Sequence, residues 1–130
     1  MMTTTLKFGL AQISQIAICV KDLPRAMAFY RDVLGMKFLF EAPPQLAFFE
    51  CGGIRLMLSR PEKAEFDHPA SIIYYKVPDI QAAYETLVDR GVQFEGEPHL
   101  IAKMPDYDLW MAFFWDLEGN MLALMSEMQN

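Results

Sequence analysis

The stretch IAICVKDLPRAMAFYRDVLGMKF, residues 16–38, is repeated in plan by IIYYKVPDIQAAYETLVDRGVQF, residues 72–94. Each begins with an apolar strand and continues through a valine, one further residue and an aspartate into an amphipathic helix. A glycine then ends the helix, and a second strand closes on a phenylalanine. An internal repeat of this kind indicates a duplicated structural unit. The chain is therefore predicted to consist of two copies of one unit.

Both helices carry boundary signals at corresponding places. Asp22 and Asp79 stand where an N-cap side chain accepts a hydrogen bond from the first turn of a helix. Pro24 follows near the start of the first helix, where no amide donor is needed. Gly35 and Gly91 suit the left-handed residue that often ends a helix. These signals predict where both helices begin and end.

Three strand-like segments follow in each unit. They are residues 36–41, 46–51 and 54–59, separated by Pro43-Pro44 and Gly52-Gly53, and residues 92–97, 110–115 and 121–126, separated by a long polar loop and Gly119-Asn120. Each unit is therefore predicted to be β-α-β-β-β, and the fold class α+β. We expect one domain over residues 1–130, with module one at about 12–60, a linker at about 61–70 and module two at about 71–126.

Composition excludes several classes of partner. The net charge of -6 and the pI near 4.8 repel a phosphate backbone, so we expect no binding to nucleic acid. The longest apolar run, LWMAFFW at residues 109–115, is too short to cross a bilayer, and the N-terminal segment lacks the apolar region of a signal peptide. We therefore expect a cytoplasmic protein without membrane contact, in which Cys19 and Cys51 stay reduced.

The duplicated unit, the opening VKDLPRAMAFYRDVLGMKF at 20–38 and the closing WDLEGNMLAL at 115–124 resemble the vicinal oxygen chelate superfamily. This superfamily includes glyoxalase I, extradiol dioxygenases, fosfomycin-modifying thiol transferases and bleomycin-binding proteins. Leu117 stands where the family usually has a proline. The resemblance implies a curved mixed sheet around a cleft, with helices on its convex side, and a homodimer.

The resemblance also implies where metal ligands would lie, in the first and last strand of each module. The corresponding residues are Gln15, Met57, Ile72 and Ala123. Three of these four cannot bind a hard divalent ion, so we expect no metal and no cofactor. The two histidines, His68 and His99, are expected to be solvated loop residues.

Strand parity predicts what lines the cleft instead, because alternate residues of a strand face opposite sides of a sheet. The predicted ligand-binding residues are Gln15, Cys19, Arg55, Met57, Tyr74, Phe113, Trp115 and Met121. Aromatic rings and methionines suit a small planar or apolar ligand, and the acidic balance favours a cationic one. The structural alternative for the same side chains is that they are ordinary core, packed against one another or against a partner chain. The segment with Tyr107 and Trp110 is long enough for a flap.

Two functions follow from this arrangement. The first is a small-molecule-binding protein without a complete metal site, acting in drug or metabolite sequestration. The alternative is a lyase-, isomerase- or dioxygenase-like enzyme of the same superfamily with an atypical or metal-free site, and no catalytic residue is assigned. A third hypothesis is that the protein is a degenerate member of the superfamily whose cleft is closed.

Overall fold

The computed structural model describes residues 8–9, 11–42, 45–61 and 71–129. His68 and nearly all of the predicted linker lie outside these described residues. The first module contains β1 (Gln15–Cys19), α1 (Leu23–Ala28) with its π-helical continuation η1 (Phe29–Val33), β2 (Lys37–Ala42), β3 (Leu46–Cys51) and β4 (Ile54–Ser59). The second contains β5 (Ile73–Lys76), α2 (Ile80–Asp89), β6 (His99–Lys103), β7 (Tyr107–Trp115) and β8 (Met121–Gln129). No helix in this part of the chain is long and apolar enough to span a membrane.

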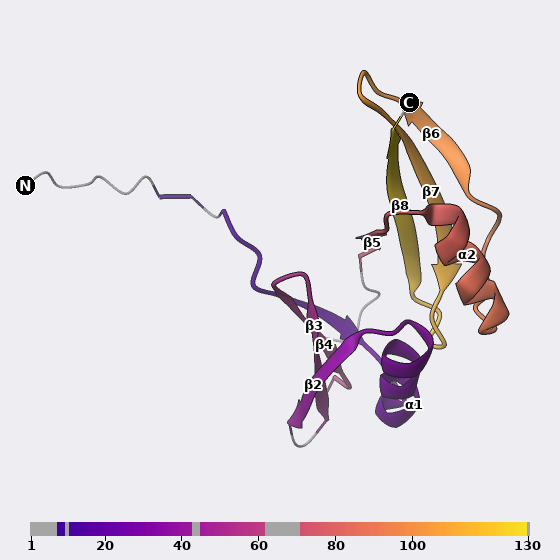
Figure 1. Cartoon of the computed structure of the whole chain (residues 1–130). Helices are drawn as coiled ribbons and strands as arrows, with labels where there is room; N and C mark the ends of the chain where they lie inside the picture. Colours follow the sequence, from indigo (N-terminus) through magenta and orange to yellow (C-terminus); the bar gives the residue numbers. More distant parts are fainter. Residues whose placement is uncertain (1–7, 10, 43–44, 62–70, 130) are drawn as a thin grey trace, which may run out of the picture.

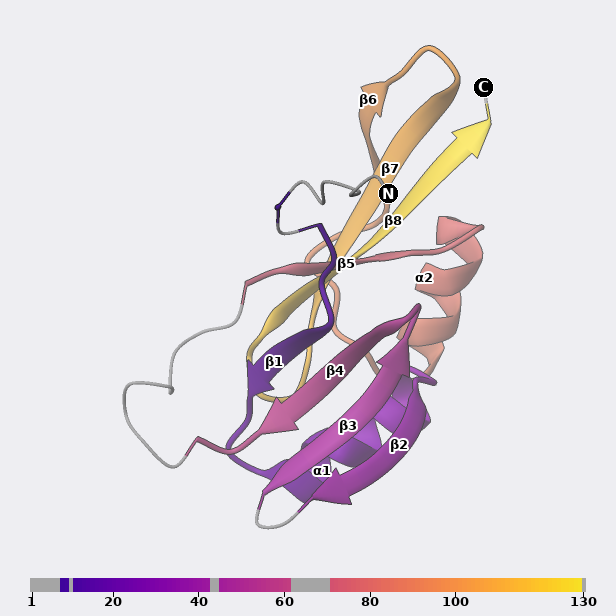
Figure 2. The ribbon, with the colours of Figure 1, turned by 90° about the vertical axis from the view of Figure 1, so that its left-hand side faces the viewer.

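Each module forms a four-stranded mixed sheet, in the order β1-β4-β3-β2 and β5-β8-β7-β6. The first strand of each module runs parallel to the last, and the other pairs are antiparallel. The expected α+β fold with two β-α-β-β-β modules is confirmed. The strands divide between two sheets, and β1 and β5 are edge strands. Both helices lie on the same side of their sheets (Figure 1), and Figure 2 shows α1 behind β3 and β4.

The predicted helix boundaries are confirmed. An Oδ1 of Asp22 accepts a hydrogen bond from the Arg25 amide at 3.2 Å, and Asp79 does the same for Ala82 at 3.1 Å. The glycines after the helices have positive φ angles, 74° at Gly35 and 88° at Gly91. An L side chain is strained there, which explains why glycine ends both helices.

One predicted strand is wrong. Residues 92–97 form no strand, and only Phe94 makes a single bridge, to Phe114. The strand that follows α2 is instead β6, which lies in the region expected to be a long polar loop and pairs antiparallel with β7. Gly96 and Pro98 interrupt the earlier segment, whereas residues 100–102 supply the apolar run of a strand. The predicted flap is therefore a β-hairpin.

A buried polar contact joins the two modules. Asp116, in the turn between β7 and β8, is 6% exposed and accepts a hydrogen bond from the hydroxyl of the fully buried Tyr30 at 2.8 Å. The same turn holds Glu118, whose carboxylate accepts from the backbone amides of Lys21 and Asp22 at 2.9 and 3.0 Å. The WDLEGN motif thus ties the second module to the start of α1. Apolar residues from the helix sides of both modules form a shared core around this contact.

Candidate functional site: two helix-free faces and a cavity between the modules

The two modules are equivalent strand for strand. The amide of Val20 donates to the Ser59 carbonyl at 2.9 Å, and the amide of Val77 donates to the Met125 carbonyl at the same distance. This correspondence pairs Gln15 with Ile72, and it also pairs Met57 with Ala123. These are the four positions from which the family resemblance expects metal ligands.

The residues at these positions do not fit a divalent metal. Nε2 of Gln15 donates to the Met57 sulfur at 3.7 Å, so the one oxygen-bearing side chain lies against a soft thioether. Ala123 is fully buried, and neither it nor Ile72 has a donor atom. Across the described residues, no group of three or more His, Cys, Asp or Glu side chains is placed to hold an ion. A hard cation requires about three or more oxygen or nitrogen ligands, which this set does not provide.

The strand register separates the two faces of each sheet. Ile18, Leu56 and Leu58 pack in the core with α1, and Phe114 and Leu124 pack there with α2. Alternate residues must point to the opposite, helix-free face. All eight predicted ligand-binding residues have that parity: Gln15, Cys19, Arg55, Met57, Tyr74, Phe113, Trp115 and Met121. The strand register is therefore consistent with their expected placement on the helix-free faces, and their role in binding stays a prediction.

On the first module's face, a guanidinium lies over two aromatic rings. The Cζ atom of Arg55 is 5.4 Å from the centroid of Phe48 and 5.8 Å from that of Phe40. The two rings are themselves 4.7 Å apart. Glu50, the cross-strand partner of Arg55, instead accepts the Gly53 amide at 2.7 Å. Arg55 has no ion-pair partner among the described residues, so its charge is available to a ligand. Sequence parity placed Arg55 here but did not reveal the stacking.

On the second module's face, Tyr74 and His99 flank Phe113. The Tyr74 ring contacts Phe113 edge-on at 6.0 Å, and the His99 ring lies 6.4 Å from it. Trp115 and Met121 are opposite each other across β7 and β8. His99 is exposed, as expected, but the expectation that it lies in a loop is wrong, because it starts β6 and pairs with Met111. The apolar residues after His99, which the flanking prolines obscured, were the available signal for this strand.

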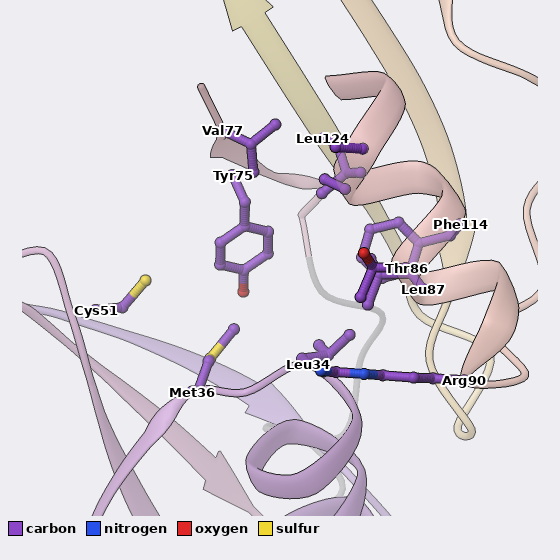
Figure 3. Close-up of a pocket in the computed structure, with 12 residues that line it drawn as sticks. Leu34, Met36, Cys51, Tyr75, Val77, Thr86, Leu87, Arg90, Phe114 and Leu124 are labelled. Atoms are coloured by element: carbon purple, nitrogen blue, oxygen red, sulfur yellow. The ribbon is translucent and has the colours of Figure 1, made fainter. Parts of the chain in front are cut away.

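The described residues of the two modules enclose a pair of cavities between them that the sequence did not predict. One of about 460 Å³ separates β5 from β1 and the β3–β4 turn, and its lining includes Ile16, Ile54 and Tyr74. The other, of about 360 Å³, lies on the helix side. It is lined by Leu34, Met36, Cys51, Tyr75, Val77, Ala82, Ala83, Thr86, Leu87, Arg90, Phe114 and Leu124 (Figure 3).

The helix-side cavity contains two weakly acidic groups that stay protonated. Burial is the main cause that raises the pKa of Tyr75, followed by the negative charge that Cys51 would carry as a thiolate and by that of Asp116. Burial and the nearby Glu50 carboxylate raise the pKa of Cys51. The buried Tyr75 hydroxyl has no hydrogen-bond partner among the described residues. A tyrosine at a core-facing position of β5 was the only sequence signal for this polar group.

Comparison with known proteins agrees with this architecture. A family model described as Glyoxalase/Bleomycin resistance protein/Dioxygenase superfamily matches residues 12–124. The uncharacterized protein YraH of Bacillus subtilis (strain 168) is 26% identical over 126 residues, which cover 87% of this chain and 96% of YraH. Among solved structures, lactoylglutathione lyase from Agrobacterium tumefaciens is 23% identical, with a TM-score of 0.75 over 91% of this chain and 95% of that one. A superfamily member from Sphaerobacter thermophilus DSM 20745 is 26% identical, with a TM-score of 0.74 over 91% and 98%. With its two β-α-β-β-β modules and a family match over nearly its whole length, the chain belongs to the Glyoxalase/Bleomycin resistance protein/Dioxygenase superfamily.

Proposed function

We propose that this protein binds a small planar ligand on its helix-free faces, without a metal ion at the family's ligand positions, and that it sequesters this ligand. The observation that carries the proposal is the position of the Arg55 guanidinium, which lies over Phe40 and Phe48 and has no ion-pair partner in the described part of the chain. A planar cation stacked on rings is a preorganised platform for another flat group. Its charge favours a ligand with an anionic substituent on this face. The expectation of a cationic ligand, based on net charge alone, remains the competing prediction.

We propose further that a second copy of the chain completes the cleft. Phe40 and Tyr74 are each 44% exposed on the helix-free faces, and Ile72 is 42% exposed beside β5. Exposed apolar groups on one face typically mark an interface. The edge strands β1 and β5 also offer backbone groups that a partner's strand can pair with. A symmetric homodimer covers both features.

A second candidate function is a lyase- or isomerase-like enzyme with metal-free chemistry. His99 supports it, since this exposed imidazole lies beside Phe113 on the same face as Tyr74. Histidine is the side chain best suited to proton transfer near neutral pH. A planar ligand that is converted rather than merely held would favour this candidate.

The test uses the purified full chain and two probe panels, planar aromatic carboxylates and planar aromatic cations. Loss of one charge-assisted contact in Arg55→Met is expected to weaken carboxylate binding about tenfold or more by isothermal titration calorimetry. Arg25→Met is the matched control, because Arg25 is an exposed cation on α1, on the helix side of the sheet. It is expected to leave affinity unchanged.

Four results would count against these proposals. Binding of cations alone, insensitive to Arg55→Met, would refute the anionic ligand. Binding of neither panel would refute the ligand face. Stoichiometric metal in the purified protein, lost in Gln15→Ala, would overturn the metal-free site. A monomer in light scattering at micromolar concentration would overturn the dimer.

A further inference from the structure

The cavity on the helix side is a feature that the proposed function does not use. Its volume of about 360 Å³ lies in the range of small-molecule sites, about 300–1,000 Å³. Leu34, Met36 and Cys51 contribute to it from the first module, and residues of β5, α2, β7 and β8 complete it from the second (Figure 3). Its lining does not include Tyr74, which points to the opposite side of β5 from Tyr75 and lines the neighbouring cavity, although Cys51 and Tyr75 line both.

The Tyr75 hydroxyl gives this cavity a specific chemistry. Figure 3 shows it pointing toward Met36, in the space between the two modules. The oxygen is buried, and no described residue accepts its hydrogen. Buried hydroxyls are nearly always hydrogen-bonded, so an unpaired one calls for an explanation. A bound molecule with an acceptor atom would supply the missing partner, and the cavity has room for such a molecule.

The remaining walls define the rest of the ligand. Leu87, Phe114 and Leu124 are buried apolar residues, and no carboxylate is among the residues that line the cavity. Arg90 lines one side, but its Nη1 atom already donates to the Val33 carbonyl at 2.8 Å. Tyr75 and Cys51 are both neutral, since burial disfavours their charged forms. The cavity thus offers mainly apolar contact and one buried donor without a partner among the described residues, the Tyr75 hydroxyl, with Thr86 and Arg90 as further polar groups in its lining.

We infer that this cavity is a second ligand site, which takes a small, uncharged, mainly apolar molecule whose single acceptor atom receives the Tyr75 hydrogen. Because its walls come from both modules, a bound molecule stabilises their observed arrangement. The site does not depend on the ligand proposed for the helix-free faces. Occupation therefore raises the melting temperature even when Arg55 is replaced.

Two probes of nearly identical shape test the directed donor. Acetophenone carries a carbonyl oxygen, and α-methylstyrene carries a CH₂ group in its place. A net hydrogen bond predicts that the full chain binds acetophenone about 2- to 10-fold more tightly than α-methylstyrene. Tyr75→Phe is expected to abolish that difference while α-methylstyrene binding is kept. Tyr84→Phe is the control, since Tyr84 packs on Phe94, is not among the cavity's lining residues and loses the same atom.

The location is checked by NMR with labelled methyl groups. Acetophenone is expected to shift the methyl signals of Met36 and Leu87 and to leave that of Met57 unchanged. Ala83→Leu fills the cavity from α2 and is expected to block both probes, with Ala82→Leu as a second filling variant if the first fails to fold. The inference is overturned if neither probe binds, if Tyr75→Phe keeps the preference for acetophenone, or if the shifts appear at Met57 instead.

Discussion

Removing the Tyr30 hydroxyl tests whether the Tyr30–Asp116 contact stabilises the joint between the modules. In Tyr30→Phe the ring keeps its packing, and only the hydrogen bond from the hydroxyl to Oδ2 of Asp116 is lost. A buried hydrogen bond to a charged group contributes about 1.5–3 kcal/mol. The carboxylate keeps three other donors, the amides of Glu118 and Asn120 and the Asn120 side chain. We therefore expect the lower end, a loss of about 1.5 kcal/mol in the free energy of unfolding.

Replacing the acceptor is expected to cost more. Asp116→Ala leaves the buried Tyr30 hydroxyl and the turn amides of Glu118 and Asn120 without their acceptor. An unpaired buried donor costs about 1–3 kcal/mol, and the two turn amides are only partly buried, so we expect a total loss of about 3 kcal/mol. Urea unfolding followed by fluorescence of the two tryptophans measures both variants.

The control for this pair of variants is Tyr84→Phe, which is expected to change stability by less than about 0.5 kcal/mol because Tyr84 is partly exposed on α2. The reasoning is refuted if Tyr30→Phe behaves like this control, or if Asp116→Ala costs no more than Tyr30→Phe. An unchanged dependence on urea concentration is required for either comparison.

Two further predictions concern pH and helix capping. Burial raises the pKa of Tyr30 and Tyr75 above the ordinary tyrosine value, so both stay neutral in the fold at about pH 10, and ionisation of either one destabilises the fold as pH rises further. Between about pH 10 and 11 the wild type is therefore expected to lose stability more steeply than Tyr30→Phe, by up to about 1.4 kcal/mol per pH unit, and equal slopes in urea titrations would contradict this. Asp22→Ala and Asp79→Ala each remove a side-chain acceptor from a helix start and are expected to lower the unfolding free energy by about 1 kcal/mol. Asp89→Ala, at the exposed end of α2, is the control in the same urea assay, and a similar loss there would argue against capping.

The side chains at the family's metal positions are the reason for proposing that a ligand binds without a metal ion there. Gln15 contacts Met57, and the equivalent positions in the second module are Ile72 and Ala123. The chain therefore has the superfamily fold, but the side chains at these four positions do not favour metal coordination. Arg55 and the rings beneath it are the most specific feature of the helix-free faces.

Local features of this protein were determined by the sequence alone. The aspartates and glycines at the helix ends act through atoms within a few residues. The helix ends at Asp22, Asp79, Gly35 and Gly91 could therefore be predicted without any tertiary information. Strand parity is equally local, and it assigned the predicted binding residues to the helix-free faces. The four positions at which the family has metal ligands could also be located from the sequence, because each lies a fixed number of residues from a local signal.

Contacts between distant segments were decided only by the tertiary structure. The strand β6 forms because residues 99–103 find a partner in β7, whereas residues 92–97, which the repeat predicted as a strand, are interrupted by Gly96. The position of Arg55 over aromatic rings depends on which side chains the fold brings near it, and so does the Tyr75 hydroxyl, which finds no partner among the residues that the structure describes. The joint at Asp116 and the cavity beside Cys51 depend on how the two modules pack against each other. A repeat specifies each module through short-range signals, but the surface between two modules is set by side chains that are far apart in the chain.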